Sequence, residues 1–203
     1  MTSHAGSIKD GHTLPESSAT ETVAPAPARL DLRGLVAAHY ASTKRLLRRL
    51  GVHTAELDDT TQEVFWIAAR RLSDIERGSE KSFLYGVALR VASQEVRRQR
   101  AADPLAAVEA VPRLLDLQPS PEEHLQQRQA RQLLDSVLRA MPCELREVFV
   151  LFELEAMAVQ EIAALQEIPI GTASSRLRRA REEFSAIAKR LRAALAAQER
   201  RRP

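Results

Sequence analysis

The sequence predicts an all-α protein: two small helical domains joined by a flexible proline-rich linker, with a helix-turn-helix in the C-terminal domain. Glycine accounts for only 7 of the 203 residues, while the helix-favouring residues Ala, Leu, Arg and Glu dominate. Runs in which Val, Ile, Thr or Tyr alternate with polar residues, as in strands, are absent. Apolar residues recur instead at helical spacing in two blocks, and a proline-rich stretch separates the blocks.

The first part of the chain contains a tail, a helical domain and a linker. Residues 1–28 are rich in Ser, Thr, Pro and Ala with few bulky apolar residues, so we expect them to be disordered. The first domain spans 29–100, and its helices are expected over 30–50, about 54–72 and 81–100, with a loop over 73–80. Four prolines between 101 and 123 prevent a long helix there and define the linker.

The second domain spans 124–193, and a basic C-terminal tail follows over 194–203. Apolar spacing predicts its helices over 125–140, 143–156, 159–165 and from 170 onward. The last two form a short helix, a brief turn and a long basic helix, which is the pattern of a helix-turn-helix.

Composition excludes several classes of protein. The formal net charge is +3, and the only cysteine, Cys143, can form neither an internal disulfide nor a thiol pair for zinc, which fits a reducing cytoplasm. No apolar run is long enough to insert into a membrane. We find no glycine-rich phosphate loop, no metal-ligand cluster and no nucleophile with a base, so we expect no enzyme, cofactor, metal or small-molecule substrate.

The long basic helix has two distinct faces at about 100° per residue. Ala173, Leu177, Ala180 and Phe184 share a narrow arc that we expect to be buried against Ile162 and Ala163 of the short helix. The opposite arc carries small hydrogen-bonding residues and then arginines, a combination suited to the major groove. A basic surface helix in contact only with water remains an alternative at this point.

Several strings in the sequence resemble the extracytoplasmic-function (ECF) sigma factors of bacterial RNA polymerase. EIAALQEIPIGTASSRLRRARE (161–182) is similar to the region 4 helix-turn-helix of that family, and MPCELREVFVLFELEAMAVQEIA precedes it as the family pattern requires. DDTTQEVFWIAARRL (58–72) resembles region 2.2, and SFLYGVALRVASQEVRRQR (82–100) resembles regions 2.3 and 2.4. The resemblance covers about 30–192 in the correct order.

The resemblance implies three partners: core RNA polymerase, promoter DNA and an anti-sigma factor. It implies that the first domain docks on the polymerase clamp helices and opens the −10 element, that the 73–80 loop captures a flipped base, and that the second domain reads the −35 element. Residues at the matching positions are Asp58, Asp59, Gln62 and Glu63 for polymerase, Arg90, Arg97, Arg98 and Arg100 for the −10 element, and Thr172, Ser174, Ser175, Arg176, Arg178 and Arg179 for the −35 element. Trp66, Phe83 and Leu177 match core positions.

The sequence also departs from the family pattern. Phe83 stands where a tryptophan is frequent, Arg90 and Gln94 stand where asparagine and aspartate are frequent, and Ala173 replaces a bulkier valine. Two other functions remain open: a stand-alone helix-turn-helix regulator that does not need polymerase, and a helical adaptor whose arginines pair with an acidic protein. The region 2-like segment favours the sigma factor, because a simple repressor has no need of the 58–72 segment or of a loop for single-stranded DNA.

Overall fold

The computed structural model describes residues 30–102 and 122–200, and every regular element within these ranges is helical. The prediction of an all-α protein is confirmed for this part of the chain. The tail 1–28 and the prolines of the linker lie outside the described residues.

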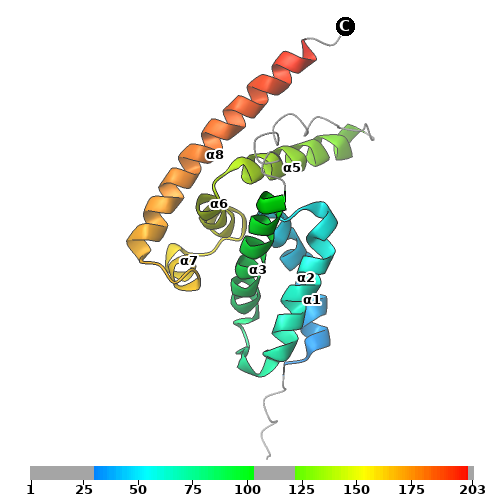
Figure 1. Cartoon of the computed structure of the whole chain (residues 1–203), viewed down its shortest axis with the longest axis vertical. Coiled ribbons are helices and arrows are strands. Elements are labelled where there is room, and N and C mark those ends of the chain that lie inside the picture. The colour runs from blue at the N-terminus through cyan, green and yellow to red at the C-terminus, as the bar shows by residue number, and fades with distance from the viewer. Residues whose placement is uncertain (1–29, 103–121, 201–203) are drawn as a thin grey trace, which may run out of the picture.

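The first domain consists of three long helices that pack around one another (Figure 1). Their bounds are α1, Leu32–Arg49; α2, Leu57–Arg70; and α3, Glu80–Ala102. Asp31 caps α1 by accepting hydrogen bonds from the backbone N–H groups of Arg33 and Gly34. Gly51 follows the end of α1 with a φ of 98°, a left-handed conformation that glycine adopts without a steric penalty. Short 3-10 turns, η1 (Thr54–Glu56) and η2 (Leu72–Asp74), flank α2.

The buried faces of these helices follow the predicted spacing, with one exception. Leu46, Val64 and Leu84 are fully buried, and Phe83 is half-buried at the edge of the core. Trp66 was expected in the core, and this is wrong, because 60% of its surface is exposed. It lies on the solvent side of α2, where the guanidinium of Arg70 stacks over its ring at 4.7 Å.

The second domain contains four α-helices and one π-helical turn within the described residues. Their bounds are α5, Glu122–Ala140; α6, Cys143–Phe149; η4, the π-helical turn, Val150–Leu154; α7, Val159–Leu165; and α8, Ile170–Glu199. The helix predicted over 143–156 is therefore α6 plus η4, and it ends at 154. The predicted tail after 193 is also wrong over 194–199, because α8 continues there and Leu191 and Leu195 still pack on the core.

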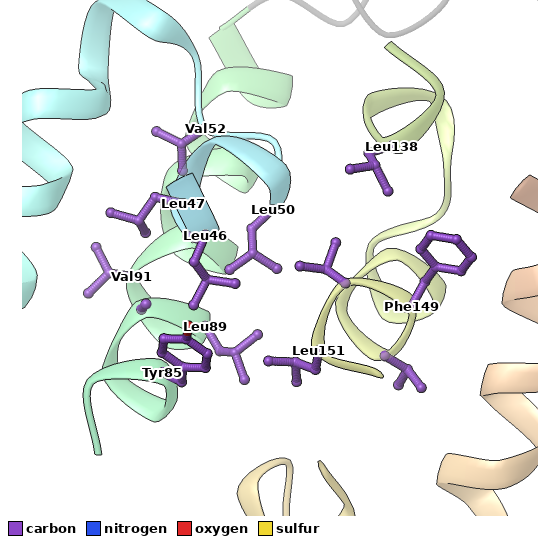
Figure 2. Close-up of a cluster of buried hydrophobic side chains, with 14 of the residues drawn as sticks. Leu46, Leu47, Leu50, Val52, Tyr85, Leu89, Val91, Leu138, Phe149 and Leu151 are labelled. Carbon is purple, nitrogen blue, oxygen red and sulfur yellow. The ribbon is translucent and has the colours of Figure 1, made fainter. Parts of the chain in front are cut away.

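The two domains share one continuous apolar cluster. Figure 2 shows Leu46, Leu50 and Leu89 of the first domain on one side and Leu138, Phe149 and Leu151 of the second on the other. In Figure 1, α6 lies between α8 and the helices of the first domain. The interdomain contact therefore fixes which surfaces of the two domains face each other.

Candidate nucleic-acid interface

The helix-turn-helix is formed by α7 and the start of α8. The carboxylate of Glu161 accepts a hydrogen bond of 2.7 Å from the backbone N–H of Ala158, which caps the start of α7. Ile162 and Ala163 are buried, as predicted. Glu167, at a φ of 55°, reverses the chain, and Ile168 N–H then donates to the carbonyl of Ala163 at 3.0 Å. These contacts set the angle at which α8 leaves the turn.

The first turns of α8 separate an apolar face from a polar one. Ala173, Leu177 and Ala180 are buried, and Phe184 stacks on Phe149 with ring centroids 4.5 Å apart. The predicted buried arc is therefore confirmed. On the opposite face, four of the residues matched to −35 reading are exposed: Ser174, Ser175, Arg178 and Arg179.

The other two residues matched to −35 reading are partly covered. Thr172 is half-buried, and its carbonyl accepts a hydrogen bond of 2.9 Å from the hydroxyl of Ser175. Arg176 is half-buried and pairs with Glu144 of α6 at 3.1 Å. Arg178 pairs with Glu182 at 2.7 Å, an exposed i,i+4 pair of little energetic weight, so its guanidinium is available to an incoming phosphate or base.

The residues matched to −10 DNA lie along the C-terminal half of α3. Arg90, Arg97, Arg98 and Arg100 are all exposed, and Arg98 also pairs with Glu95 at 2.8 Å and with Glu56 at 3.6 Å. Arg90 and Arg97 are two turns apart on one face. This face lines a cleft with a volume of about 410 Å³, whose other wall contains Leu165, Gln166 and Arg176 of the helix-turn-helix.

Three of the residues matched to polymerase binding share the outer face of α2. Asp59, Gln62 and Glu63 are exposed, and Trp66 continues the same face one turn later. Sequence reasoning placed Trp66 in the core, although its spacing of three and four residues from Glu63 and Gln62 already pointed to the polar face. Asp58 lies apart, because its carboxylate bonds to Lys44 and to Tyr40 of α1. The Lys44 ammonium lowers the pKa of Asp58 below its usual range.

The predicted loop 73–80 begins within the 3-10 turn η2. Ile75 is buried and anchors this segment to the core, while Arg77 and Gly78 are exposed. Gly78 has a φ of 87°, and its N–H donates to the carboxylate of Glu80 at 2.7 Å. Throughout residues 30–102 and 122–200 we find no group of three metal-ligating side chains. None of the helices described has the length and apolar character needed to cross a membrane.

Family models of known proteins match both domains. The model described as "Sigma-70 region 2" matches residues 35–102, and "Sigma-70, region 4" matches residues 131–184. The ECF RNA polymerase sigma-E factor of Escherichia coli K12 is 31% identical over 140 residues, which cover 64% of this chain and 73% of that relative. The ECF RNA polymerase sigma factor SigE of Mycolicibacterium smegmatis is 28% identical over 150 residues, covering 74% of this chain and 58% of that relative.

Two solved structures have the same fold. CnrH in complex with the cytosolic domain of CnrY superposes with a TM-score of 0.56 at 24% identity, covering 78% of this chain and 87% of CnrH. The sigma factor RpoE in complex with the anti-sigma factor NepR, from Bartonella quintana, gives a TM-score of 0.60 at 18% identity, covering 78% of this chain and 97% of RpoE. At these identities the likeness is one of fold.

Proposed function

This chain belongs to the extracytoplasmic-function sigma factors, and we propose that it binds core RNA polymerase and directs initiation at promoters whose −10 element its first domain opens and whose −35 element its second domain reads. Sigma factors are non-enzymatic initiation subunits, so the chemistry of transcription belongs to the polymerase. This chain contributes the recognition of the promoter and the opening of its strands.

The observation that carries this proposal is the exposed polar face of α8 behind a buried brace. Ser174 and Ser175 are small, so they permit close approach to base edges near the start of the helix. Arg178 and Arg179 follow one turn later, where a guanidinium can bind guanine O6 and N7 with two hydrogen bonds. Arg176, half-buried beside Glu144, is better placed for phosphate.

In the first domain, the exposed arginines of α3 are proposed to contact −10 DNA. Arg90, Arg97, Arg98 and Arg100 are exposed and provide positive charge for phosphate, Arg98 while it is paired with Glu95. The 73–80 segment is proposed to receive a flipped base, because Ile75 anchors it while its tip stays exposed.

The outer face of α2 is proposed to dock on core polymerase. Asp59, Gln62 and Glu63 supply polar contacts, and Trp66 supplies an exposed aromatic anchor of the kind enriched at interfaces. Asp58 is proposed to act beside them while tied to Lys44. Because RpoE was solved in complex with the anti-sigma factor NepR, and CnrH in complex with the cytosolic domain of CnrY, we also propose an anti-sigma factor as a partner of this protein.

Binding of promoter DNA by reconstituted holoenzyme tests this assignment. Arg179→Ala should weaken binding by about 1–3 kcal/mol and relax preference at one −35 position, because a bidentate base contact is lost. Arg176→Ala should instead reduce the salt dependence of binding by a slope of about 0.9, as expected for one phosphate contact. Arg192→Ala is the matched control, since Arg192 is an exposed arginine of the same helix beyond the helix-turn-helix.

Two outcomes would contradict the proposal. If the wild-type protein does not comigrate with core polymerase at moderate salt, a stand-alone regulator explains the helix-turn-helix better. If Arg179→Ala binds DNA as well as Arg192→Ala, α8 does not read the −35 element through this face. Equal weakening on all sequences would make Arg179 a phosphate contact and leave base reading to its neighbours.

A further inference from the structure

Ile170, the first residue of α8, has a large apolar side chain that lies mostly in solvent. Its exposed fraction is 53%, and Trp66 is the other large apolar side chain that is exposed to a similar extent in the described part of the chain. Single apolar residues on a surface are common, so exposure alone assigns no role to Ile170. Its position does, because the turn that follows α7 presents it at the outer edge of the molecule (Figure 1).

The backbone at the start of α8 does not depend on the Ile170 side chain. The carbonyl of Pro169 accepts hydrogen bonds from the backbone N–H groups of Thr172 at 2.9 Å and of Ala173 at 3.1 Å, and these bonds begin the helix. A Cβ added to Gly171 would have no atom of the described residues within 4 Å, apart from its neighbours in the chain and the backbone of α8. The first turn of α8 is therefore held by backbone contacts and stands clear of the rest of the protein.

Ile170 extends the exposed face that carries the residues matched to −35 reading. Ser174 and Arg178 follow it at intervals of four residues, and both are exposed. Side chains at this spacing form one ridge along a helix, and each is inclined toward the helix N-terminus. The ridge therefore begins with an apolar side chain, continues with a hydroxyl group and ends with a guanidinium.

The chemistry of the base edges limits what this apolar side chain can contact. In a helix-turn-helix, the N-terminal residues of the second helix contact base edges in the major groove. Isoleucine has no side-chain donor or acceptor, so the hydrogen-bonding atoms of the bases offer it no partner. The C5-methyl group of thymine is the apolar group that these edges present. Ile170 therefore matches thymine.

A protein partner fits Ile170 less well than a base does. A stable protein interface buries about 800 Å² on each partner, and its centre is a cluster of large apolar side chains. The exposed neighbours Glu167 and Ser174 are polar, and Gly171 has no side chain. One apolar side chain within a polar surface is suited to one methyl group.

We propose that Ile170 is a specificity-determining residue of the −35 interface, and that its side chain contacts the C5-methyl group of one thymine in the major groove. Ser174 and Arg178 of the same ridge contact the base pairs next to that thymine. The inference rests on the proposed function, since α8 must enter the −35 element. It adds to that function a preference for thymine at one position and the residue that causes it.

Removal of the thymine methyl group tests this contact. Holoenzyme reconstituted from core polymerase and the full chain first selects its −35 element from duplexes randomised over that region. Each thymine of the selected element is then replaced in turn by deoxyuridine, which lacks only the C5-methyl group. One replacement should weaken binding by the wild-type holoenzyme about 4-fold, as expected for the loss of one buried methyl group. Deoxyuridine in the spacer should leave binding unchanged.

Substitutions in the chain then assign the effect to one side chain. Ile170→Ala should bind the thymine and deoxyuridine duplexes equally well, because alanine ends at Cβ and does not reach the methyl group. Ile170→Val keeps the branched Cβ and should retain part of the difference. Ile168→Ala is the matched control, because it removes the same side chain from a half-buried position in the turn and should leave the 4-fold ratio unchanged.

Several results would overturn the inference while the proposed function stands. If the selected −35 element shows no loss with deoxyuridine, or the same loss with wild type and Ile170→Ala, Ile170 contacts no thymine methyl group. If Ile168→Ala abolishes the ratio as fully as Ile170→Ala, the ratio depends on the angle of α8. If Ile170→Ala weakens binding to core polymerase without DNA, the side chain is a polymerase contact. A holoenzyme that selects no −35 element would contradict the proposed function itself, and the inference with it.

Discussion

Gly51→Ala is expected to destabilise the protein through two separable effects. A Cβ at this position would lie 1.9 Å from Nη1 and 2.9 Å from Cζ of Arg146, and the backbone φ is 98°. The left-handed conformation alone costs an alanine about 1–2 kcal/mol. Displacing a fully packed side chain adds about 1–3 kcal/mol. Arg146 is buried, with 1% of its surface exposed, so its guanidinium can yield only by displacing neighbouring core residues or by moving toward solvent.

A double-mutant cycle separates the two effects. In an Arg146→Ala background the guanidinium is gone, so Gly51→Ala should cost only the backbone term of about 1–2 kcal/mol. The free energy of unfolding of all four proteins can be measured by urea denaturation followed by far-UV circular dichroism. Residues in contact couple, so we expect an interaction energy above about 1 kcal/mol. Additivity within about 0.5 kcal/mol would refute the packing of Arg146 against Gly51.

The exposure of Trp66 and the burial of the Cys143 thiol each predict the outcome of a simple measurement. Trp66→Ala should change the free energy of unfolding by less than about 0.5 kcal/mol, because the residue is on the surface. The same substitution should weaken binding to core polymerase in a titration. A large loss of stability would show that Trp66 is a core residue. Burial and the nearby Glu147 carboxylate raise the pKa of the Cys143 thiol, so less thiolate is present at pH 8 and iodoacetamide should react more slowly with the native protein than with the urea-unfolded chain. Equal rates of reaction in the native and unfolded chains would contradict a buried Cys143 thiol.

Local patterns predicted the helix-turn-helix well. The bounds 159–165 of α7 and the start of α8 at Ile170 agree with the structure, because the turn between them is set by adjacent residues. The buried arc of Ala173, Leu177 and Ala180 follows from helical periodicity alone. Helix ends were less accurate elsewhere: α8 runs past the expected limit because its alanine-rich end favours helix and Leu195 still finds a packing partner.

Contacts between distant segments were not predictable from local spacing. Glu155 and Arg49 are 106 residues apart, and no sequence pattern near either residue indicates that they form an ion pair. No local pattern indicates that Arg146 is buried, and Gly51 of the other domain lies against its guanidinium. Trp66 was expected in the core because it matches a core position of the family, whereas in this chain it lies on the polar face of α2.

The burial of Arg146 opposes an interdomain contact that otherwise consists of a large apolar cluster. Apolar burial across the interface favours contact between the two domains, and each buried leucine contributes about 1.5–3 kcal/mol. When the domains separate, the Arg146 guanidinium and the Glu155 carboxylate regain their hydration, and this recovered solvation offsets part of the lost apolar contact. Arg146→Met would keep the apolar contact and remove the desolvation penalty, so it should strengthen the contact between the domains. The free energy of unfolding measured by urea denaturation should then rise, and a loss of stability would show that the buried guanidinium is stabilising where it lies.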